Sequence, residues 1–325
     1  MDVFSSVAQG SSRDYLRAAA VQAALELGIF ERLEEGARSM DELSWHLGVT
    51  STHRLQALLD VLVLEKILAR EGEGEDAQVA LQHPIAPAPL LPRAGWGMLA
   101  EVIRNDAPLD EPGVSGRESG DALQRFHAHL CSAGADAAAE LMGPLAREEG
   151  GLLLDLGSGA GAYSKAWLEA RTDARALLLD RPEVLELAKG ALGPQALARA
   201  ELRAAELADD APWPEANVVL LANLLHLFGP EEAQQFVSRA ADAALPGGAV
   251  VIKDLRLEPD RLGPAPGVLF SLNMALFTRE GRVHTEDALL DFLRVAGLVD
   301  LELRTLESAP DALVARGRKP RREGA

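Results

Sequence analysis

The chain has 325 residues, a length that fits two ordinary domains. Hydrophobic residues make up 48% and charged residues 25%, which excludes a globally disordered chain. The net charge of −18 argues against a general binder of nucleic acid or of anionic membranes, because both partners repel such a chain. The single cysteine, Cys131, excludes an intramolecular disulfide and a thiolate metal cluster, and it fits a reducing compartment.

The first residues lack the basic-then-apolar pattern of a signal peptide. No apolar run approaches the ~18 residues that a membrane-spanning helix needs. We therefore expect a soluble, cytoplasmic protein with no membrane partner.

The first hundred residues have a helical pattern. Apolar residues at helical spacing predict a helix over residues 14–33, with Gly28 near its end. Ser39 and Glu42 have the spacing of a capping box, which marks the start of a short helix. A leucine-rich helix and two short strands around an acidic turn follow. This order predicts a winged-helix unit, which we assign to residues 1–92.

Winged helices often bind DNA, so we weighed that alternative. Residues 1–100 contain eight Lys or Arg and fourteen Asp or Glu, which leaves the region acidic. The helix that would enter a groove offers only His53, Arg54 and Lys66 as phosphate contacts. The composition therefore favours a dimerisation or scaffold role and predicts no nucleic-acid partner.

The remaining chain divides into a helical part and an alternating part. Residues 84–92 are proline-rich and predict a connector, and residues 93–147 predict a helical linker and substrate-pocket region. Strand and helix patterns alternate over residues 148–318, which predicts an α/β domain of Rossmann-like type with a parallel sheet. Residues 319–325 are expected to be a disordered tail.

A glycine-rich turn carries the strongest chemical signal. An apolar strand that ends in Asp155 leads into Gly157, Gly159 and Gly161, and a helix follows. Glycines let the backbone approach a ligand closely at a helix start. The third glycine comes one position too early for the dinucleotide pattern Gly-x-Gly-x-x-Gly, which disfavours a nicotinamide dehydrogenase. Asp155 lies close to where a phosphate would bind, and an acid there suits an amino group instead.

The next predicted strand ends at Asp180. An acid at this point of the second strand can accept both ribose hydroxyls of a nucleoside ligand. Together with the glycine turn, Asp180 predicts S-adenosylmethionine (SAM) as the cofactor rather than a turn that merely reverses the chain. Ser158 and Arg181, which adjoin these residues, complete the predicted nucleoside contacts.

An ordered set of motifs carries a family resemblance over roughly residues 14–317. The segments DLGSGAGAYS, LLLDRPEV, APWPEANVVLLANLLHLF, PGGAVVIKD and GRVHTEDALLDFLRVAGL resemble those of SAM-dependent small-molecule O-methyltransferases of the plant caffeic-acid and bacterial antibiotic type. The segment LGIFERLEEGARSMDELSWHLGVTSTHRLQALLDVLVLEKIL is similar to that family's dimerisation domain. The resemblance implies a homodimer with a Rossmann-like methyltransferase domain.

His226 is the candidate general base. It follows a predicted strand at the edge where ligands of open α/β sheets bind, and a neutral imidazole there could take a phenol or enol proton. In the similar family the histidine of this motif is the base, and the following aromatic residue, here Phe228, packs by the adenine. The alternative is a histidine that simply caps the strand end.

Two departures from the family pattern affect the residues that would support His226. Asp254 stands where the family commonly has a longer glutamate, and Val283 stands where a second acid is usual. The orientation of His226 could therefore rest on Asp254 alone, on His284, or on the substrate. We include Asp254 with His226 as a catalytic candidate.

The resemblance also implies further cofactor contacts. Glu206 and Leu207 match the acid and apolar residue after the third strand, with Asp209 as a shifted alternative for the acid. Asn223, near the end of the fourth strand, is a candidate contact for the amino-acid part of SAM. A bond from Asn223 to the local backbone is the alternative.

Candidate acceptor contacts come from two segments that line the pocket in the similar family. They are Phe126, His129, Met142, Asn273 and Met274. No histidine or cysteine spacing matches a zinc site, so no metal is predicted.

These observations predict a SAM-dependent methyltransferase acting on the oxygen of a small aromatic or polyketide-like metabolite. Three alternatives remain open from the sequence: methylation at nitrogen or carbon, a SAM-binding enzyme that performs another reaction, and a winged-helix regulator.

Overall fold

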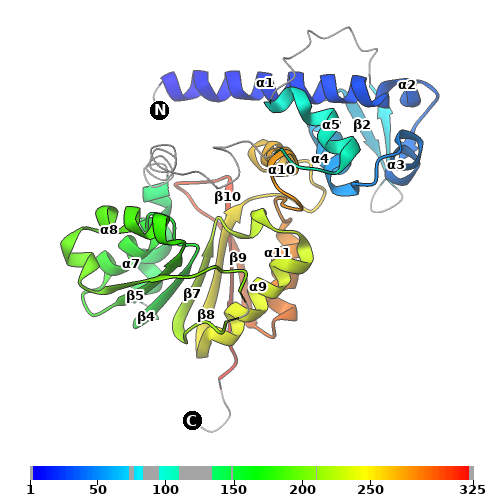
Figure 1. The fold of residues 1–325 in the computed structure, drawn as a ribbon. Helices are drawn as coiled ribbons and strands as arrows, with labels where there is room; N and C mark the ends of the chain where they lie inside the picture. Colours follow the sequence, from blue (N-terminus) through cyan, green and yellow to red (C-terminus); the bar gives the residue numbers. More distant parts are fainter. Residues whose placement is uncertain are drawn as a thin grey trace. The chain divides into compact units, whose positions relative to one another are not determined.

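A computed structural model of the chain describes residues 3–72, 77–82, 95–109, 134–147, 149–209 and 211–321 (Figure 1). The predicted connector at 84–92 lies outside them. The chain divides into two compact units, each formed by two stretches of sequence. Unit 1 comprises Met1–Glu111 and Leu257–Val283, and unit 2 comprises Pro112–Arg256 and His284–Ala325.

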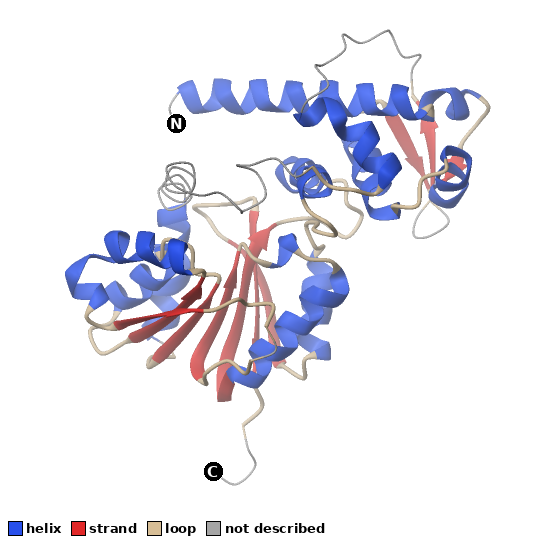
Figure 2. Cartoon of the chain, viewed as in Figure 1, coloured by secondary structure: helices blue, strands red, loops and turns tan. Residues whose placement is uncertain are grey.

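Unit 1 is mainly helical with a small antiparallel sheet in the strand order β1-β3-β2 (Figure 2). Its described elements are α1 (Val3–Leu27), α2 (Ile29–Glu34), β1 (Arg38–Ser39), α3 (Met40–Leu47), α4 (Thr52–Leu64), β2 (Leu68–Glu71), β3 (Gln78–Leu81), η2 (Gly95–Met98), α5 (Leu99–Asn105) and α10 (Ala265–Phe277). The β2–β3 pair after α3 and α4 confirms the winged-helix prediction.

Two local signals in the sequence explain where these helices begin and end. Gly28 adopts φ 79°, a left-handed conformation that separates α1 from α2. The capping box before α3 is formed as predicted: the Glu42 amide donates to Ser39 Oγ at 3.3 Å, and the Ser39 amide donates to Glu42 Oε2 at 2.8 Å.

Residues 257–283 group with the N-terminal region, whereas the sequence placed them in the domain over 148–318. The cause is the packing of α10 on α4, which centres on the fully buried Arg54. Its guanidinium donates to the backbone oxygens of Ala275 and Arg279, the latter at 2.8 Å, and to Asp106 Oδ1 at 2.9 Å. Arg54 therefore links α4 to the backbone at Ala275 and Arg279, and its buried guanidinium is not available to a DNA phosphate.

Unit 2 contains a seven-stranded sheet in the order β6-β5-β4-β7-β8-β10-β9. Strands β6, β5, β4, β7 and β8 pair in parallel, and β10 pairs antiparallel with β8 and with β9, which confirms the predicted parallel sheet and closing strand pair. Besides a helix at residues 134–147, its described elements are β4 (Leu152–Leu156), α7 (Ala162–Ala170), β5 (Arg175–Asp180), α8 (Pro182–Leu197), β6 (Ala200–Ala204), β7 (Ala216–Ala222), η3 (Leu225–Leu227), α9 (Pro230–Ala243), β8 (Ala244–Leu255), α11 (Glu286–Val295), β9 (Val299–Thr305) and β10 (Ala312–Arg318).

Side chains alternate between two cores on opposite faces of this sheet. Leu153 and Leu178 pack with α7 and α8, whereas Leu154 and Leu179 pack with α9 and α11 (Figure 2). Because both faces are covered, the strands read as continuous apolar runs, and polar side chains gather where the strands end. No described helix is long and apolar enough to cross a membrane.

Candidate functional site

The glycine turn between β4 and α7 requires glycine at three positions. Gly157, Gly159 and Gly161 have φ values of 67°, 56° and 80°, all in the left-handed region. A Cβ atom on Gly157 would lie 3.1 Å from Leu224 Cδ1, and one on Gly161 would lie 3.2 Å from Leu178 Cδ2. The turn therefore combines unusual backbone angles with close packing, and any side chain would disturb it.

Asp180, at the end of β5, is fixed against this turn. Its Oδ2 accepts the Gly159 amide at 2.8 Å, and its Oδ1 accepts the Arg181 amide at 2.7 Å. A carboxylate has about four acceptor positions, so the two oxygens can still accept ribose hydroxyls. The structure thus brings together the two features that predicted a nucleoside ligand.

Asp155, in β4 directly below the turn, is a buried carboxyl whose Oδ2 accepts the Ser164 hydroxyl at 2.6 Å. Burial and the charge of Asp180 raise the pKa of Asp155 to about 7, although the Ser164 hydrogen bond partly opposes the rise. Ser158 Oγ is also buried and has no partner among the described residues. Two neighbouring acids and an unused hydroxyl fit a ligand that carries a positive charge and polar groups, as SAM does.

Two residues of the first turn of α7 join this cluster, and the sequence analysis missed both. Ser164 binds Asp155, and Tyr163 hydrogen-bonds Asn223, whose Oδ1 also accepts Lys253 Nζ at 2.7 Å. Burial and the Asp155 carboxyl raise the pKa of Tyr163. Hydroxyl residues directly after a glycine turn were the signal that could have identified them.

His226, in η3 after β7, contacts Asp254 on the neighbouring strand β8. The Nδ1 atom lies 2.7 Å from Asp254 Oδ1, and the His226 amide donates to Asp254 Oδ2 at 3.2 Å. Both residues are buried, with relative exposures of 7% and 3%. One carboxylate therefore holds His226 at two points, the imidazole Nδ1 and the backbone amide.

The ionisation of Asp254 decides which nitrogen of His226 carries the proton. Burial alone would raise the pKa of Asp254, but the charge and hydrogen bonds of His226, together with the Leu255 amide and Lys253, hold the pKa below its usual value. An ionised carboxylate can only accept, so Nδ1 is the protonated nitrogen and Nε2 is the acceptor of the neutral ring.

His284 plays a different part from the one left open by the sequence. Its buried side chain donates from Nε2 to the backbone oxygen of Leu225 at 3.1 Å, and its ring meets Phe292 edge-on at 5.1 Å. His284 thus supports the backbone of η3, while Asp254 contacts the His226 imidazole directly. Val283 is buried, with 1% exposure.

The predicted adenine contacts lie beside the glycine turn or on the adjoining loops. Leu207 is buried, and its Cδ1 lies 3.6 Å from the Cβ position of Gly157. Glu206 is exposed, and Phe228 is half-buried and stacks on Phe236 with a centroid separation of 4.5 Å.

The predicted acceptor contacts that the structure describes come from both units. Met142 lies in the core of unit 2, whereas Asn273 and Met274 lie on α10 of unit 1. Phe126 and His129 lie outside the described residues. Within the described part of the chain, no group of three or more His, Cys, Asp or Glu side chains could hold a metal ion.

Relatives of this chain include methyltransferases from animals and bacteria. Human acetylserotonin O-methyltransferase is 28% identical, with 90% of this chain and 92% of the relative covered. The tetracenomycin polyketide synthesis 8-O-methyl transferase of Streptomyces glaucescens is also 28% identical, with 93% of each chain covered.

Solved structures show the same fold at lower identity. An O-methyltransferase family 2 protein from Planctomyces limnophilus, in complex with apigenin, superposes with a TM-score of 0.72 at 23% identity, covering 94% of this chain and 93% of that one. Human N-acetylserotonin methyltransferase in complex with SAM superposes with a TM-score of 0.59, also at 23% identity, covering 98% and 99%.

The family profiles match both halves of the chain. The O-methyltransferase domain matches residues 132–299, and the O-methyltransferase dimerisation domain matches residues 12–82. The second match supports homodimer formation. The chain therefore belongs to the SAM-dependent O-methyltransferase family, as the glycine turn with Asp180 had indicated.

Proposed function

We propose that this protein transfers the methyl group of SAM to a hydroxyl oxygen of a small aromatic or polyketide-like metabolite. The names of its relatives support this substrate class, since they include an enzyme for acetylserotonin and one of polyketide synthesis. The observation that carries the mechanism is the His226–Asp254 pair, which presents an imidazole with a defined tautomer beside the cofactor turn.

Residues around the glycine turn would hold the cofactor. The backbone at Gly157, Gly159 and Gly161, which carries no side chains, lets the cofactor approach closely. Asp180 accepts its ribose hydroxyls, and Asp155 balances its amino group. Bound SAM would supply an electrophilic methyl group. Further contacts are assigned to Ser158, Arg181, Glu206, Leu207, Asn223 and Phe228.

His226 acts as the general base in this proposal. Its Nε2 would accept the hydroxyl proton of the acceptor as the acceptor oxygen bonds to the methyl carbon of SAM. The bond from that carbon to sulfur would break, and S-adenosylhomocysteine would leave. Asp254 stabilises the imidazolium that results and keeps the ring in place. A positioned base contributes about 10²–10⁴-fold to the rate, and orientation of the reacting atoms supplies the rest. Acceptor contacts are assigned to Phe126, His129, Met142, Asn273 and Met274.

Replacing the base tests this mechanism. His226→Ala should lower kcat about 10²–10⁴-fold with a phenolic acceptor and labelled SAM, while the Kd of S-adenosylhomocysteine stays within about twofold. His46→Ala is the matched control, because His46 is an exposed histidine of α3. If the His226→Ala enzyme kept the wild-type pH profile and kcat, His226 would not be the base, and the positioning of SAM and acceptor would account for the rate. Failure to form S-adenosylhomocysteine with any acceptor would instead favour a non-methylating reaction.

A further inference from the structure

Unit 1 contains a cavity of about 220 Å³ between α4 and the segment at residues 257–283. Its polar lining includes His53, Arg261, Ser271 and Arg282, and the alanines of both helices line its apolar part. One water molecule occupies ~30 Å³ of liquid, so the cavity has room for a small ligand.

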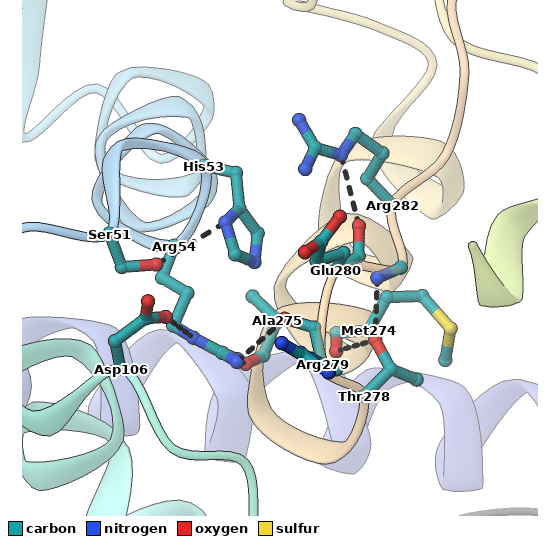
Figure 3. Close-up of polar contacts among 11 residues, drawn as sticks. Ser51, His53, Arg54, Asp106, Met274, Ala275, Thr278, Arg279, Glu280 and Arg282 are labelled. Atoms are coloured by element: carbon teal, nitrogen blue, oxygen red, sulfur yellow. Dashed lines mark hydrogen bonds and ion pairs between the residues drawn. The ribbon is translucent and has the colours of Figure 1, made fainter. Parts of the chain in front are cut away.

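Two hydrogen-bonding atoms of this lining are unused. Ser271 is 1% exposed, and its Oγ has no partner within the described chain. The Nε2 of His53 is likewise buried without a partner, whereas its Nδ1 lies 3.2 Å from Ser51 Oγ (Figure 3). Buried polar atoms in folded proteins are nearly always paired, so two such atoms on one cavity indicate a missing partner.

Arginine side chains also bring positive charge to the cavity lining. Arg282 donates from Nε to the backbone oxygen of Glu280 at 3.1 Å (Figure 3), and its guanidinium forms no ion pair with a carboxylate of the described residues. Burial and the charges of Arg261 and Arg54 lower the pKa of Arg282, whereas the charge of Glu280 acts in the opposite direction. Burial, Arg282 and Arg54 also lower the pKa of His53, to about 4, although Asp106 opposes this shift.

Two other nearby acids are committed to other arginines. Asp60 accepts Arg70 at 2.5 Å and Arg261 at 2.6 Å, and Asp106 pairs with Arg54 at 2.9 Å. Glu280 acts on Arg282 through its charge, without an ion pair between the two side chains among the described residues.

We propose that this cavity binds a small oxyanion, a carboxylate or a phosphate, held by Arg282, Ser271 and His53. The planar guanidinium can donate two parallel hydrogen bonds to either group, and Ser271 supplies a third. The neutral His53 ring completes the site at Nε2, as donor or acceptor according to its tautomer.

This site shares no residue with the proposed methyl-transfer machinery. The cofactor turn and His226 belong to unit 2. Two proposed acceptor contacts also lie on α10. Asn273 is about 200° around the helix from Ser271, and neither Asn273 nor Met274 lines the cavity. The oxyanion site consequently does not depend on the proposed reaction.

Calorimetric titration of the full chain tests the site. Inorganic phosphate and succinate would be titrated separately in an anion-poor buffer, with saturating S-adenosylhomocysteine to occupy the cofactor turn. At least one probe should give saturable binding, and the probe that binds identifies the class. Arg282→Gln should weaken it at least tenfold, the size expected for a hydrogen bond to a charged group. Ser271→Ala should weaken it severalfold.

Arg32→Gln is the matched control, because it removes one exposed arginine of unit 1 and should leave binding within twofold. Arg282→Lys keeps the charge and loses the planar geometry, so its affinity should fall between wild type and Arg282→Gln. Three results would overturn the proposal: no saturable binding of either probe, an equal loss in Arg32→Gln, or wild-type affinity in Ser271→Ala together with any folded Arg282 variant.

Discussion

The two units bury titratable groups in opposite electrostatic surroundings. In unit 2 burial and Asp180 raise the pKa of Asp155 to about 7, which marks a surplus of negative charge beside the cofactor turn. In unit 1 burial and two arginines lower the pKa of His53 to about 4, which marks a surplus of positive charge around the cavity. Each surplus is best relieved by a ligand of the opposite sign.

The His226–Asp254 pair shows the contrasting, balanced case. Its acid and base meet at 2.7 Å, so each charge that forms on one residue is matched by the other. A histidine therefore serves as a candidate base in unit 2 and as a candidate ligand-binding group in unit 1. The difference lies entirely in the charges that the fold places around the ring.

The largest expected effect comes from breaking the balanced pair. Asp254→Asn should lower kcat about 10²–10³-fold, because an amide can donate to Nδ1 and reverse the tautomer that His226 needs. The Kd of S-adenosylhomocysteine should change little. His46→Gln, at an exposed histidine of α3, is the control, and its kcat should match that of the wild type. An Asp254→Asn enzyme with unchanged kcat would show that the acid does not position the base.

Unit 1 should prove structurally dependent on its buried arginine. Arg54→Met should reduce the free energy of unfolding by about 3 kcal/mol, because it leaves two carbonyls and Asp106 without their donor. Urea denaturation monitored by circular dichroism measures this change, with Arg32→Met as the exposed control. A loss below about 0.5 kcal/mol would mean that water replaces the guanidinium without cost.

Removing the Asp180 carboxylate tests the role of negative charge beside the glycine turn of unit 2. Asp180→Ala should weaken SAM and S-adenosylhomocysteine alike by tenfold or more, since a hydrogen bond to a charged group is worth about 1.5–3 kcal/mol. The variant also loses the acceptor of the Gly159 amide. Calorimetry with both ligands measures the effect, and Asp173→Ala, at an exposed carboxylate of unit 2, serves as the control. An unchanged Kd would move the ribose contact elsewhere.

The smallest effect is a pH dependence of cofactor binding through Asp155. The free protein has a raised pKa of about 7, and a cationic ligand favours the ionised carboxylate, so the bound pKa is lower. Affinity for S-adenosylhomocysteine should therefore rise roughly tenfold from about pH 6 to pH 8, with release of a proton. Titrations in buffers of different ionisation enthalpy measure that release. Asp155→Asn should bind with no such slope, and a slope retained in this variant would assign the proton to another group.

Local patterns predicted much of unit 2 because the signals lie close together in sequence. The glycine turn needs left-handed backbone angles that mark it clearly, and Asp180 follows from the length of one strand–helix–strand repeat. The roles of Ser164 and Tyr163 were missed because they depend on where the first turn of α7 points. Whether Asp254 or His284 contacts His226 also needed the structure, since β7 and β8 must first be aligned.

The sequence by itself determined the family, the winged-helix order, the parallel sheet and the cofactor turn, because each follows from periodicity or from short-range backbone requirements. Only the tertiary structure decided that residues 257–283 join unit 1, that Arg54 is buried among carbonyl groups, and that Arg282, Ser271 and His53 line one cavity. His53 and Arg54 lie more than two hundred positions before Ser271 and Arg282 in the sequence. No local sequence pattern predicts that these side chains are close in space, because their contact depends on the packing of α10 against α4.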